Sequence, residues 1–266
     1  KEASLSFSTL GCPDWDFQKI VSFASQHNYK GIEVRGLQRQ LDLPQCPEFS
    51  NATHIKETMQ TMKKNGLKFI GLGSSATLHF KEGEERQKNL SEKIRCPYVR
   101  VFPNRFPEGQ DKQETIKLIV DGLLELGDYG KKRSVTVLLE THGDVVWISD
   151  LEQIMIAARH SHVGLLWDVS NMWTITKEPV QEAYLRLKPY IRHTHLKDAV
   201  SLDGKLQYKL LGKGEVPIFE AISALEEDGY KGFYSFEWEK MWHPEIEEPE
   251  VALTDYSRVM KKFWNR

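Results

Sequence analysis

The chain of 266 residues is poor in cysteine and has no long hydrophobic run. No apolar stretch reaches the ~20 residues that a helix needs to cross a bilayer, so we expect no membrane partner. Its three cysteines, Cys12, Cys46 and Cys96, stand at unrelated spacings, which excludes a disulfide scaffold and a cysteine zinc site. Each is expected to be a small buried residue. We expect a cytoplasmic protein, although a chain beginning at Lys1 indicates a processed or trimmed N-terminus and leaves the location open.

The sequence also lacks a charge excess of either sign. Its 36 Lys and Arg residues nearly balance 38 Asp and Glu, for a formal net charge of −2. Such a chain has no general attraction to nucleic acid or to anionic membranes. No Gly-x-Gly-x-x-Gly follows the first apolar stretch, which weakens a dinucleotide-binding interpretation. At 40% hydrophobic residues, the composition is ample for a single core.

Eight short apolar stretches alternate with eight helical patterns along the chain. The helices are expected to begin near Asp14, Asn51, Lys81, Gln113, Ser149, Glu178, Pro217 and Val251. Strict alternation at this length favours an α/β fold, a closed (β/α)8 TIM barrel forming a single domain over residues 1–266. The expected strands are Leu5–Thr9, Gly31–Arg35, Lys68–Leu72, Tyr98–Phe102, Val135–Glu140, Val163–Asp168, Ile191–His195 and Phe233–Phe236.

Four consecutive strands carry a metal-ligand type of residue at their carboxyl ends. The unbroken apolar run from Val135 stops at Glu140, and the next three strands end near Asp168, His195 and Glu237. The carboxyl ends of barrel strands form one rim, where the active sites of such barrels lie. Three carboxylates and one imidazole suit a hard divalent cation. We therefore predict one divalent metal, most favourably Mn²⁺, with Mg²⁺, Co²⁺ or Zn²⁺ as alternatives; a buried salt-bridge network is the competing interpretation.

Several motifs give the chain a family resemblance. The segments 139–142 (Leu-Glu-Thr-His), 195–198 (His-Leu-Lys-Asp), 212–216 (Gly-Lys-Gly-Glu-Val) and 236–239 (Phe-Glu-Trp-Glu) resemble the xylose-isomerase-like sugar isomerase/epimerase superfamily. The resemblance implies the same four ligands, Glu140, Asp168, His195 and Glu237, and a small-molecule sugar substrate. Glu140 and Glu237 are then the expected catalytic acid and base, which move a proton next to a carbonyl through an enediolate.

Other polar residues are expected near the substrate. His142 and Lys197 each follow a proposed ligand by two residues, which places them on the same side of an extended strand. His142 is otherwise a capping or surface residue, and Lys197 otherwise forms a rim salt bridge with Asp198. Glu33 and Arg100 lie in the second and fourth strands, where they face the barrel mouth or pair with each other. His193 is expected to form hydrogen bonds in the core.

Three positions depart from the ketohexose 3-epimerases of this superfamily. Those enzymes grip the sugar with a carboxylate, an imidazole and a guanidinium, where this chain has Val146, Asn171 and Ser201. Asn171 remains a candidate substrate contact. The departures predict that the proton-transfer chemistry is kept, whereas the substrate differs from a free ketohexose.

The sequence leaves other functions open. A lyase resembling inosose dehydratase would use the same proton abstraction but expel a hydroxyl group. An apurinic endonuclease of the same superfamily would need extra histidines and a basic face that this sequence does not have. A barrel retained as a binding module is the third alternative. The identity of the sugar, its phosphorylation and a homo-oligomeric state also stay open.

Overall fold

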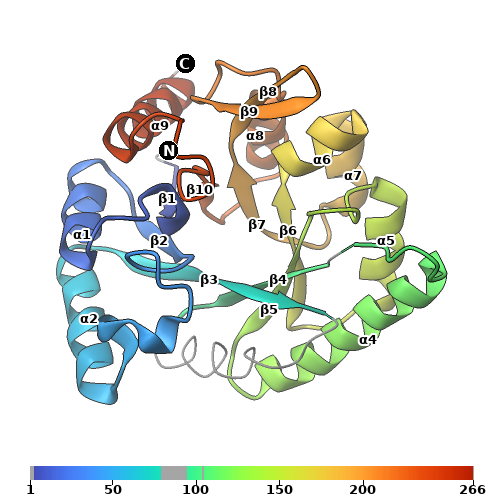
Figure 1. The fold of residues 1–266 in the computed structure, drawn as a ribbon, viewed down its shortest axis with the longest axis horizontal. Coiled ribbons are helices and arrows are strands. Elements are labelled where there is room, and N and C mark those ends of the chain that lie inside the picture. The colour runs from blue at the N-terminus through green and yellow to red at the C-terminus, as the bar shows by residue number, and fades with distance from the viewer. Residues whose placement is uncertain (1–2, 79–94, 104, 266) are drawn as a thin grey trace.

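The protein is a closed barrel of eight parallel strands, seen in a computed structural model that describes residues 3–78, 95–103 and 105–265 (Figure 1). Around the barrel the strands follow the order β1, β10, β7, β6, β5, β4, β3, β2. The strands are β1 (Leu5–Ser8), β2 (Gly31–Val34), β3 (Lys68–Thr77), β4 (Tyr98–Phe102), β5 (Thr136–Glu140), β6 (Val163–Asp168), β7 (Ile191–Leu196) and β10 (Tyr234–Phe236). This confirms the predicted α/β barrel.

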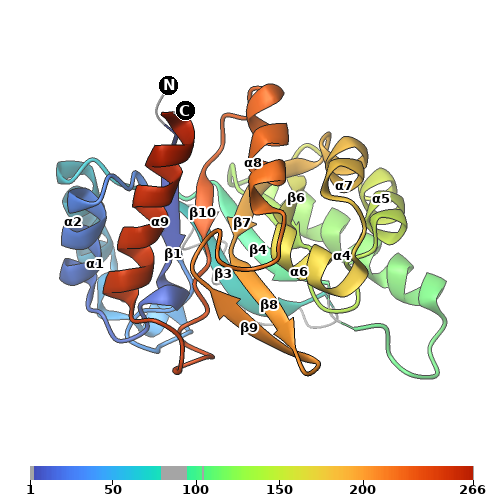
Figure 2. The ribbon, with the colours of Figure 1, turned by 90° about the horizontal axis from the view of Figure 1, so that it is seen from above.

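Helices surround the barrel and cover its outer face (Figures 1 and 2). The helix expected to follow Lys81 lies outside the described residues. Among those described, no helix is long and apolar enough to cross a membrane. The helices are α1 (Phe17–Gln26), α2 (Ala52–Lys64), α4 (Lys112–Lys131), α5 (Ile148–Ala157), α6 (Val169–Thr176), α7 (Val180–Leu187), α8 (Ile218–Glu227) and α9 (Pro249–Trp264).

Local chemistry explains where some boundaries differ from expectation. Asp16 rather than Asp14 caps α1, because its side chain accepts a hydrogen bond from the Lys19 N–H at 2.8 Å, whereas Asp14 pairs with Arg39. Asn51 caps α2 as predicted. Two elements were not expected. The short helix α6 follows β6 directly, and an antiparallel hairpin of β8 (Asp198–Leu202) and β9 (Lys205–Lys209) follows β7.

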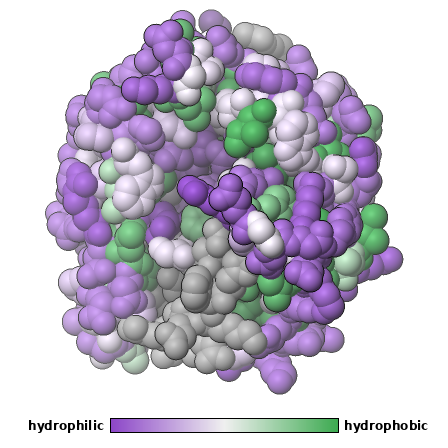
Figure 3. Space-filling model, turned by 45° about the vertical axis from the view of Figure 1, so that its right-hand side comes forward, coloured by the Kyte–Doolittle hydropathy of each residue, from purple (hydrophilic) through white to green (hydrophobic). Residues whose placement is uncertain are grey.

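The hydrophobic core lies between the barrel wall and the helices. Trp167 of β6 stacks on Tyr184 of α7 at 5.7 Å between ring centroids, and Phe236 of β10 stacks on Tyr256 of α9 at 4.5 Å. A fully buried aromatic or aliphatic side chain contributes roughly 1.5–3 kcal/mol to stability. The cysteines at 12, 46 and 96 form no disulfide and are buried, as expected. The described surface in Figure 3 is mostly hydrophilic, with hydrophobic residues in small separate patches.

Candidate metal centre at the carboxyl end of the barrel

Strand register brings the four predicted ligands together. Asp168 of β6 and His195 of β7 are direct Cα partners, and Glu140 ends the neighbouring strand β5. Glu237 follows β10, which pairs with the other edge of β7. One ligand atom from each of these residues lies within 4.8 Å of every other, and all four side chains are buried. The expected convergence of these strand ends is therefore present in the fold.

His195 is oriented with one ring nitrogen toward the carboxylates and the other away from them. Its Nδ1 atom lies 3.0 Å from Glu237, 3.3 Å from Glu140 and 3.7 Å from Asp168. Its Nε2 atom lies 2.6 Å from Oε1 of Glu33. Because a carboxylate accepts, Nε2 carries the hydrogen in this pair. Burial lowers the pKa of His195, but the surrounding carboxylates outweigh burial and hold that pKa well above its usual value. Nδ1 therefore also carries a hydrogen, which it would release on binding a metal ion among the three carboxylates.

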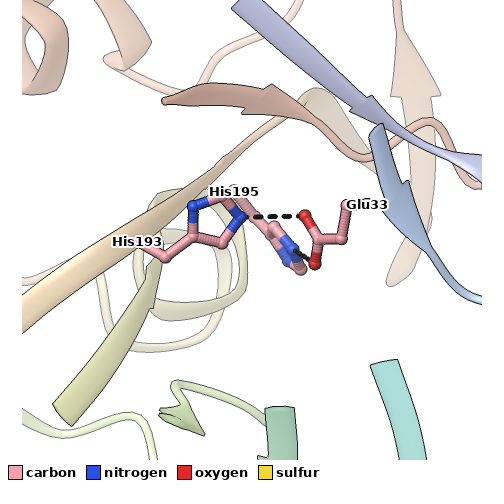
Figure 4. A group of neighbouring side chains, drawn as sticks. All are labelled: Glu33, His193 and His195. Carbon is pink, nitrogen blue, oxygen red and sulfur yellow. Dashed lines mark hydrogen bonds and ion pairs between the residues drawn. The ribbon is translucent and has the colours of Figure 1, made fainter. Parts of the chain in front are cut away.

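Glu33 fixes the histidines of β7 from the opposite side of the barrel interior. Figure 4 shows both imidazoles turned toward its carboxylate, with His193 at 2.9 Å from Oε2 and His195 at 2.6 Å from Oε1. The Ser235 hydroxyl donates to Oε2 at 2.9 Å. Gly71 faces the same interior, and a Cβ built there would lie 3.5 Å from the Glu33 side chain. Burial raises the pKa of Glu33, but the two histidines outweigh burial and leave the pKa below its usual range.

This position of Glu33 differs from the expectation that it faces the mouth or pairs with Arg100. Both of its carboxylate oxygens are occupied by groups of β7 and β10. It therefore acts on the site through His195, whose ring it orients, as carboxylates commonly do for metal-binding histidines. His193 has the predicted hydrogen-bonding role in the core.

Lys197 is a buried cation within the acidic cluster. Only 1% of its surface is exposed, and its Nζ atom lies 2.9 Å from Asp168, 2.6 Å from Glu237 and 2.8 Å from Glu239. Burial lowers its pKa, but the three carboxylates outweigh burial and hold the pKa of Lys197 well above its usual value. The alternative rim pairing with Asp198 is replaced by these three partners. Lys197 therefore holds a proton at the site throughout the ordinary pH range.

Asp198 instead organises the segment after the hairpin. Its carboxylate accepts hydrogen bonds from four backbone N–H groups, those of Ala199, Gly212, Gly214 and Val216. A Cβ at Gly214 would lie 2.1 Å from Oδ1 of Asp198, so only glycine fits at this position. The motif over residues 212–216, quoted above for its resemblance, thus supports the loop that follows Lys197.

Two glutamates after β10 experience opposite electrostatic effects. Burial raises the pKa of Glu237, but His195 and Lys197 outweigh burial and leave that pKa well below its usual range. Burial raises the pKa of Glu239 to about 7. Lys197 lowers this pKa, and the charge of Glu237 raises it further. Glu237 is thus an ionised carboxylate at neutral pH, whereas Glu239 lies near half protonation.

The donor set fits a divalent cation. Oε2 of Glu140 and Oδ2 of Asp168 are buried without an aligned hydrogen bond, although Arg100 and Lys197 lie 3.2 and 2.9 Å from them. Buried carboxylate oxygens are normally hydrogen-bonded or coordinate metals. Three carboxylates with one imidazole are ligands that Mn²⁺ and similar ions accept. Glu140, Asp168, His195 and Glu237 would hold such an ion.

A second charged pair lies beside the cluster, over β3. Arg100 of β4 approaches Glu140 at 3.2 Å, and its guanidinium stacks on Phe102 with 3.8 Å to the ring centroid. Arg35 follows β2 and is also buried, with Nη2 donating to Ser75 at 2.9 Å. Burial lowers the pKa of Arg35 to about 10, and the charge of Arg100 adds to this effect. A Cβ at Gly73 would lie 2.7 Å from Cδ of Arg35 and 3.0 Å from Nη2 of Arg100, so the missing side chain leaves room for both arginines.

The remaining predicted contacts lie at the edge of the cluster. His142 is exposed, with its ring 4.6 Å from that of Phe102. Asn171 belongs to α6; its N–H donates to Asp168 at 2.9 Å and its amide to the Thr141 carbonyl at 3.2 Å. Substrate contact by either residue stays a prediction.

Sequence reasoning missed Arg35 and Glu239, although a signal for each was present. Arg35 follows Glu33 by two residues and Glu239 follows Glu237 by two, so each shares the inward phase of its strand. Arg35 was placed at the end of the expected second strand but was given no role, and the last expected strand ended at Phe236, before Glu239. The same alternation places His193, His195 and Lys197 on one side of β7.

The chain belongs to the family described as xylose isomerase-like TIM barrel, whose sequence profile matches residues 21–262. No curated protein sequence matches it. The family agrees with the resemblance inferred from the four motifs, and the match spans the strands that carry the cluster.

Solved structures with the same fold are distant in sequence. The probable 3-DHS dehydratase AsbF from Bacillus anthracis has a TM-score of 0.80 at 17% identity, covering 97% of this chain and 98% of its own. The IOLI protein with a binding zinc atom has a TM-score of 0.79 at 20% identity, covering 98% and 99%. D-psicose 3-epimerase with D-tagatose, from Clostridium cellulolyticum H10, has a TM-score of 0.74 at 17% identity, covering 97% and 99%. At these identities the likeness establishes a shared fold.

Proposed function

We propose that this protein is a divalent-metal-dependent isomerase or epimerase acting on a sugar, keto-sugar or related polyol. The observation that carries the proposal is the buried convergence of Glu140, Asp168, His195 and Glu237, with two carboxylate oxygens lacking aligned hydrogen bonds. Sugar epimerases with this fold, such as the D-psicose 3-epimerase, support the substrate class. Mn²⁺ is the preferred ion by donor chemistry, with Mg²⁺, Co²⁺ or Zn²⁺ as alternatives.

Glu140 and Glu237 are the proposed proton-transfer residues. They follow β5 and β10, which are separated in the barrel by β6 and β7, so they approach a bound substrate from different sides. A bound divalent ion would polarise the substrate carbonyl and favour ionisation of the neighbouring C–H. Return of the proton to the other face of the same carbon gives an epimer; return to the adjacent carbon gives an aldose–ketose pair.

Other residues prepare the two glutamates for these steps. Lys197 and His195 keep Glu237 ionised, so that it can accept a proton. Glu33 holds the His195 ring in one orientation. The Lys197 ammonium, buried beside Asp168 and Glu237, can also donate a hydrogen bond to a substrate oxygen that becomes negative in the transition state.

The test combines metal content with isotope uptake. Purified protein should contain about one divalent ion per chain, and chelation should lower its melting temperature because the ion binds only the folded state. His195→Ala should abolish most of this difference. Turnover in D₂O should place deuterium on the carbon next to the carbonyl. Unchanged melting with chelator, together with the absence of metal after dialysis against Mn²⁺, would contradict the proposal, and product without deuterium would replace proton transfer by an internal hydride shift.

A dehydratase is the second candidate. The similarity in fold to the probable 3-DHS dehydratase AsbF favours it, because a dehydratase would use the same first proton abstraction and then expel a hydroxyl group. Mass spectrometry separates the two reactions, since a dehydratase product has lost water whereas an isomer keeps the substrate mass.

A further inference from the structure

We propose that the substrate of this site carries a carboxylate group, which Arg35 and Arg100 bind over strand β3. This inference rests on the proposed function and narrows its substrate class to sugar acids and other polyhydroxy acids. The neighbouring strands β2, β3 and β4 provide none of the four ligands of the acidic cluster.

Gly73 of β3 has no side chain, and this leaves room for Arg35 after β2 and Arg100 in β4. Arg35 shares the inward phase of Glu33 at the end of β2, and Arg100 is the Cα partner of Gly73 across β3 and β4. A methyl group at Gly73 would collide with Arg35 at 2.7 Å and press on Arg100 at 3.0 Å. Because the Cδ methylene of Arg35 and the guanidinium of Arg100 both border the space above one glycine, the two side chains lie close together despite their like charge.

The pair has more buried donors than partners. Arg35 is 8% exposed and Arg100 is 5% exposed. Among the described residues, Nη1 of Arg35 and Nε of Arg100 have no hydrogen-bond acceptor, whereas Nη1 of Arg100 has an unaligned ion pair with Glu140 at 3.2 Å. An unpaired buried donor on a charged group costs considerable free energy. Two neighbouring arginines with two unpaired buried nitrogens therefore form a binding site for an anion that brings its own oxygens.

Contacts already made by the two arginines hold them in place for such a ligand. Ser75 accepts from Nη2 of Arg35 at 2.9 Å, and Phe102 supports the face of Arg100 at 3.8 Å. Held guanidiniums lose little rotamer freedom when an anion binds, which favours affinity. Their planar donors match the two oxygens of a carboxylate.

The position of the pair favours a carboxylate over a phosphate ester. Arg100 lies 3.2 Å from Glu140, one of the two proposed proton-transfer residues. An anion bound here lies close to the reacting carbon, as a carboxylate attached directly to the carbon chain does. Phosphate groups in these barrels usually bind at the loops after the seventh and eighth strands, which correspond to β7 and β10. Arg35 follows β2 and Arg100 lies within β4, and both strands are on another part of the barrel.

The experiment compares matched ligands that differ in one group. Binding to the Mn²⁺-loaded protein is measured by calorimetry for D-glucuronate, D-glucose and D-glucose 6-phosphate, for the galactose equivalents, and for quinate with myo-inositol. Concentrations extend to about 10 mM, above the ordinary range of KM values. At least one acid should bind about 10-fold or more tightly than its neutral counterpart, the scale of one charged hydrogen bond.

Variants then assign the preference to the pair. Arg35→Gln and Arg100→Gln should each remove the preference for the acid, and Arg35→Lys should restore part of it. Arg192→Gln, which removes a charge from an exposed residue at the amino end of β7, is the matched control and should change nothing. Melting curves and Mn²⁺ content verify that each variant is folded and loaded.

Two results would overturn the inference. One is that no acid in the panel binds more tightly than its neutral partner; the other is that the phosphate esters bind more tightly than the acids. A protein that takes up Mn²⁺ and incorporates deuterium into a neutral sugar, yet shows no preference for acids, keeps the proposed function and loses only this inference. Failure to bind any divalent ion would instead remove the proposed function itself.

Discussion

The two sides of the barrel mouth bury charge in different ways. On the side of β5, β6, β7 and β10, each carboxylate lies close to a cation, as Glu237 does between His195 and Lys197. On the side of β2, β3 and β4, the two arginines keep unpaired donors. Uncompensated burial is costly on either side. The acidic side keeps two carboxylate oxygens without aligned hydrogen bonds, which a cation would satisfy, whereas the arginine side keeps nitrogen donors, which an anion would satisfy.

Glutamate-to-glutamine substitutions on the acidic side should have the largest effect on turnover. Glu140→Gln and Glu237→Gln each keep the side-chain shape but remove the ionisable group, so turnover should fall by about 100-fold to 10,000-fold. Steady-state kinetics on the active substrate provides the measurement. Glu182→Gln on the exposed surface of α7 is the control. Near-normal turnover in both site variants would mean that neither residue transfers the proton.

Free ketohexoses test how the segments that follow β5, β6 and β7 recognise a substrate. Val146 is buried in the core, Ser201 is exposed on β8, and the Asn171 amide already donates to Thr141, so these positions supply no charged group to a ketose. Each missing charged hydrogen bond is worth about 1.5–3 kcal/mol before allowance for non-additivity. Fructose, psicose and tagatose should therefore be poor substrates with saturating Mn²⁺. A kcat/KM above about 10⁴ M⁻¹s⁻¹ for any of them would show that other residues bind the sugar hydroxyls.

Glu33→Gln tests whether the acidic side depends on residues that support the ligands. The amide keeps the size of Glu33 but provides only one acceptor oxygen for the donors of His193, His195 and Ser235. Loss of this support should weaken Mn²⁺ binding by about 10-fold to 100-fold, with a smaller effect on melting of the metal-free protein. Calorimetric titration of the metal measures it. Equal metal affinity in the variant would assign Glu33 to packing alone.

Gly214→Ala should produce the smallest effect, confined to the loop next to the acidic side. The added methyl would meet Asp198 at 2.1 Å and force the loop away from it. Overpacking of this kind costs about 1–3 kcal/mol. Denaturant unfolding would show the loss, and Gly122→Ala in α4, where a Cβ meets its nearest atoms at an ordinary 3.5 Å, is the comparison for the effect of removing a glycine. Equal stability of the wild-type protein and Gly214→Ala would mean that the loop shifts at no cost.

The prediction from sequence succeeded where a residue's place follows from its strand. Apolar runs ending in Glu140 and Asp168 predict strand ends, and in a parallel barrel strand ends share one rim. Residues whose role depends on distant partners could not be assigned in this way. The hairpin of β8 and β9 continues into a loop whose backbone N–H groups bind Asp198 from 14 to 18 positions further along. Likewise, the proximity of Arg35 to Arg100 depends on the absence of a side chain at Gly73 in a third strand.

The pairing of β1 with β10 has a consequence for how the protein folds. Leu5 lies opposite Tyr234, so the last seam of the barrel joins segments from nearly opposite ends of the sequence. Contacts between such distant segments form late, because the loop-closure entropy must first be overcome. Until β10 arrives, β1 and β7 remain open edges to which another chain can add. Glu237 follows β10 directly, so a nascent chain completes this edge of the barrel and the proton-transfer pair in the same step.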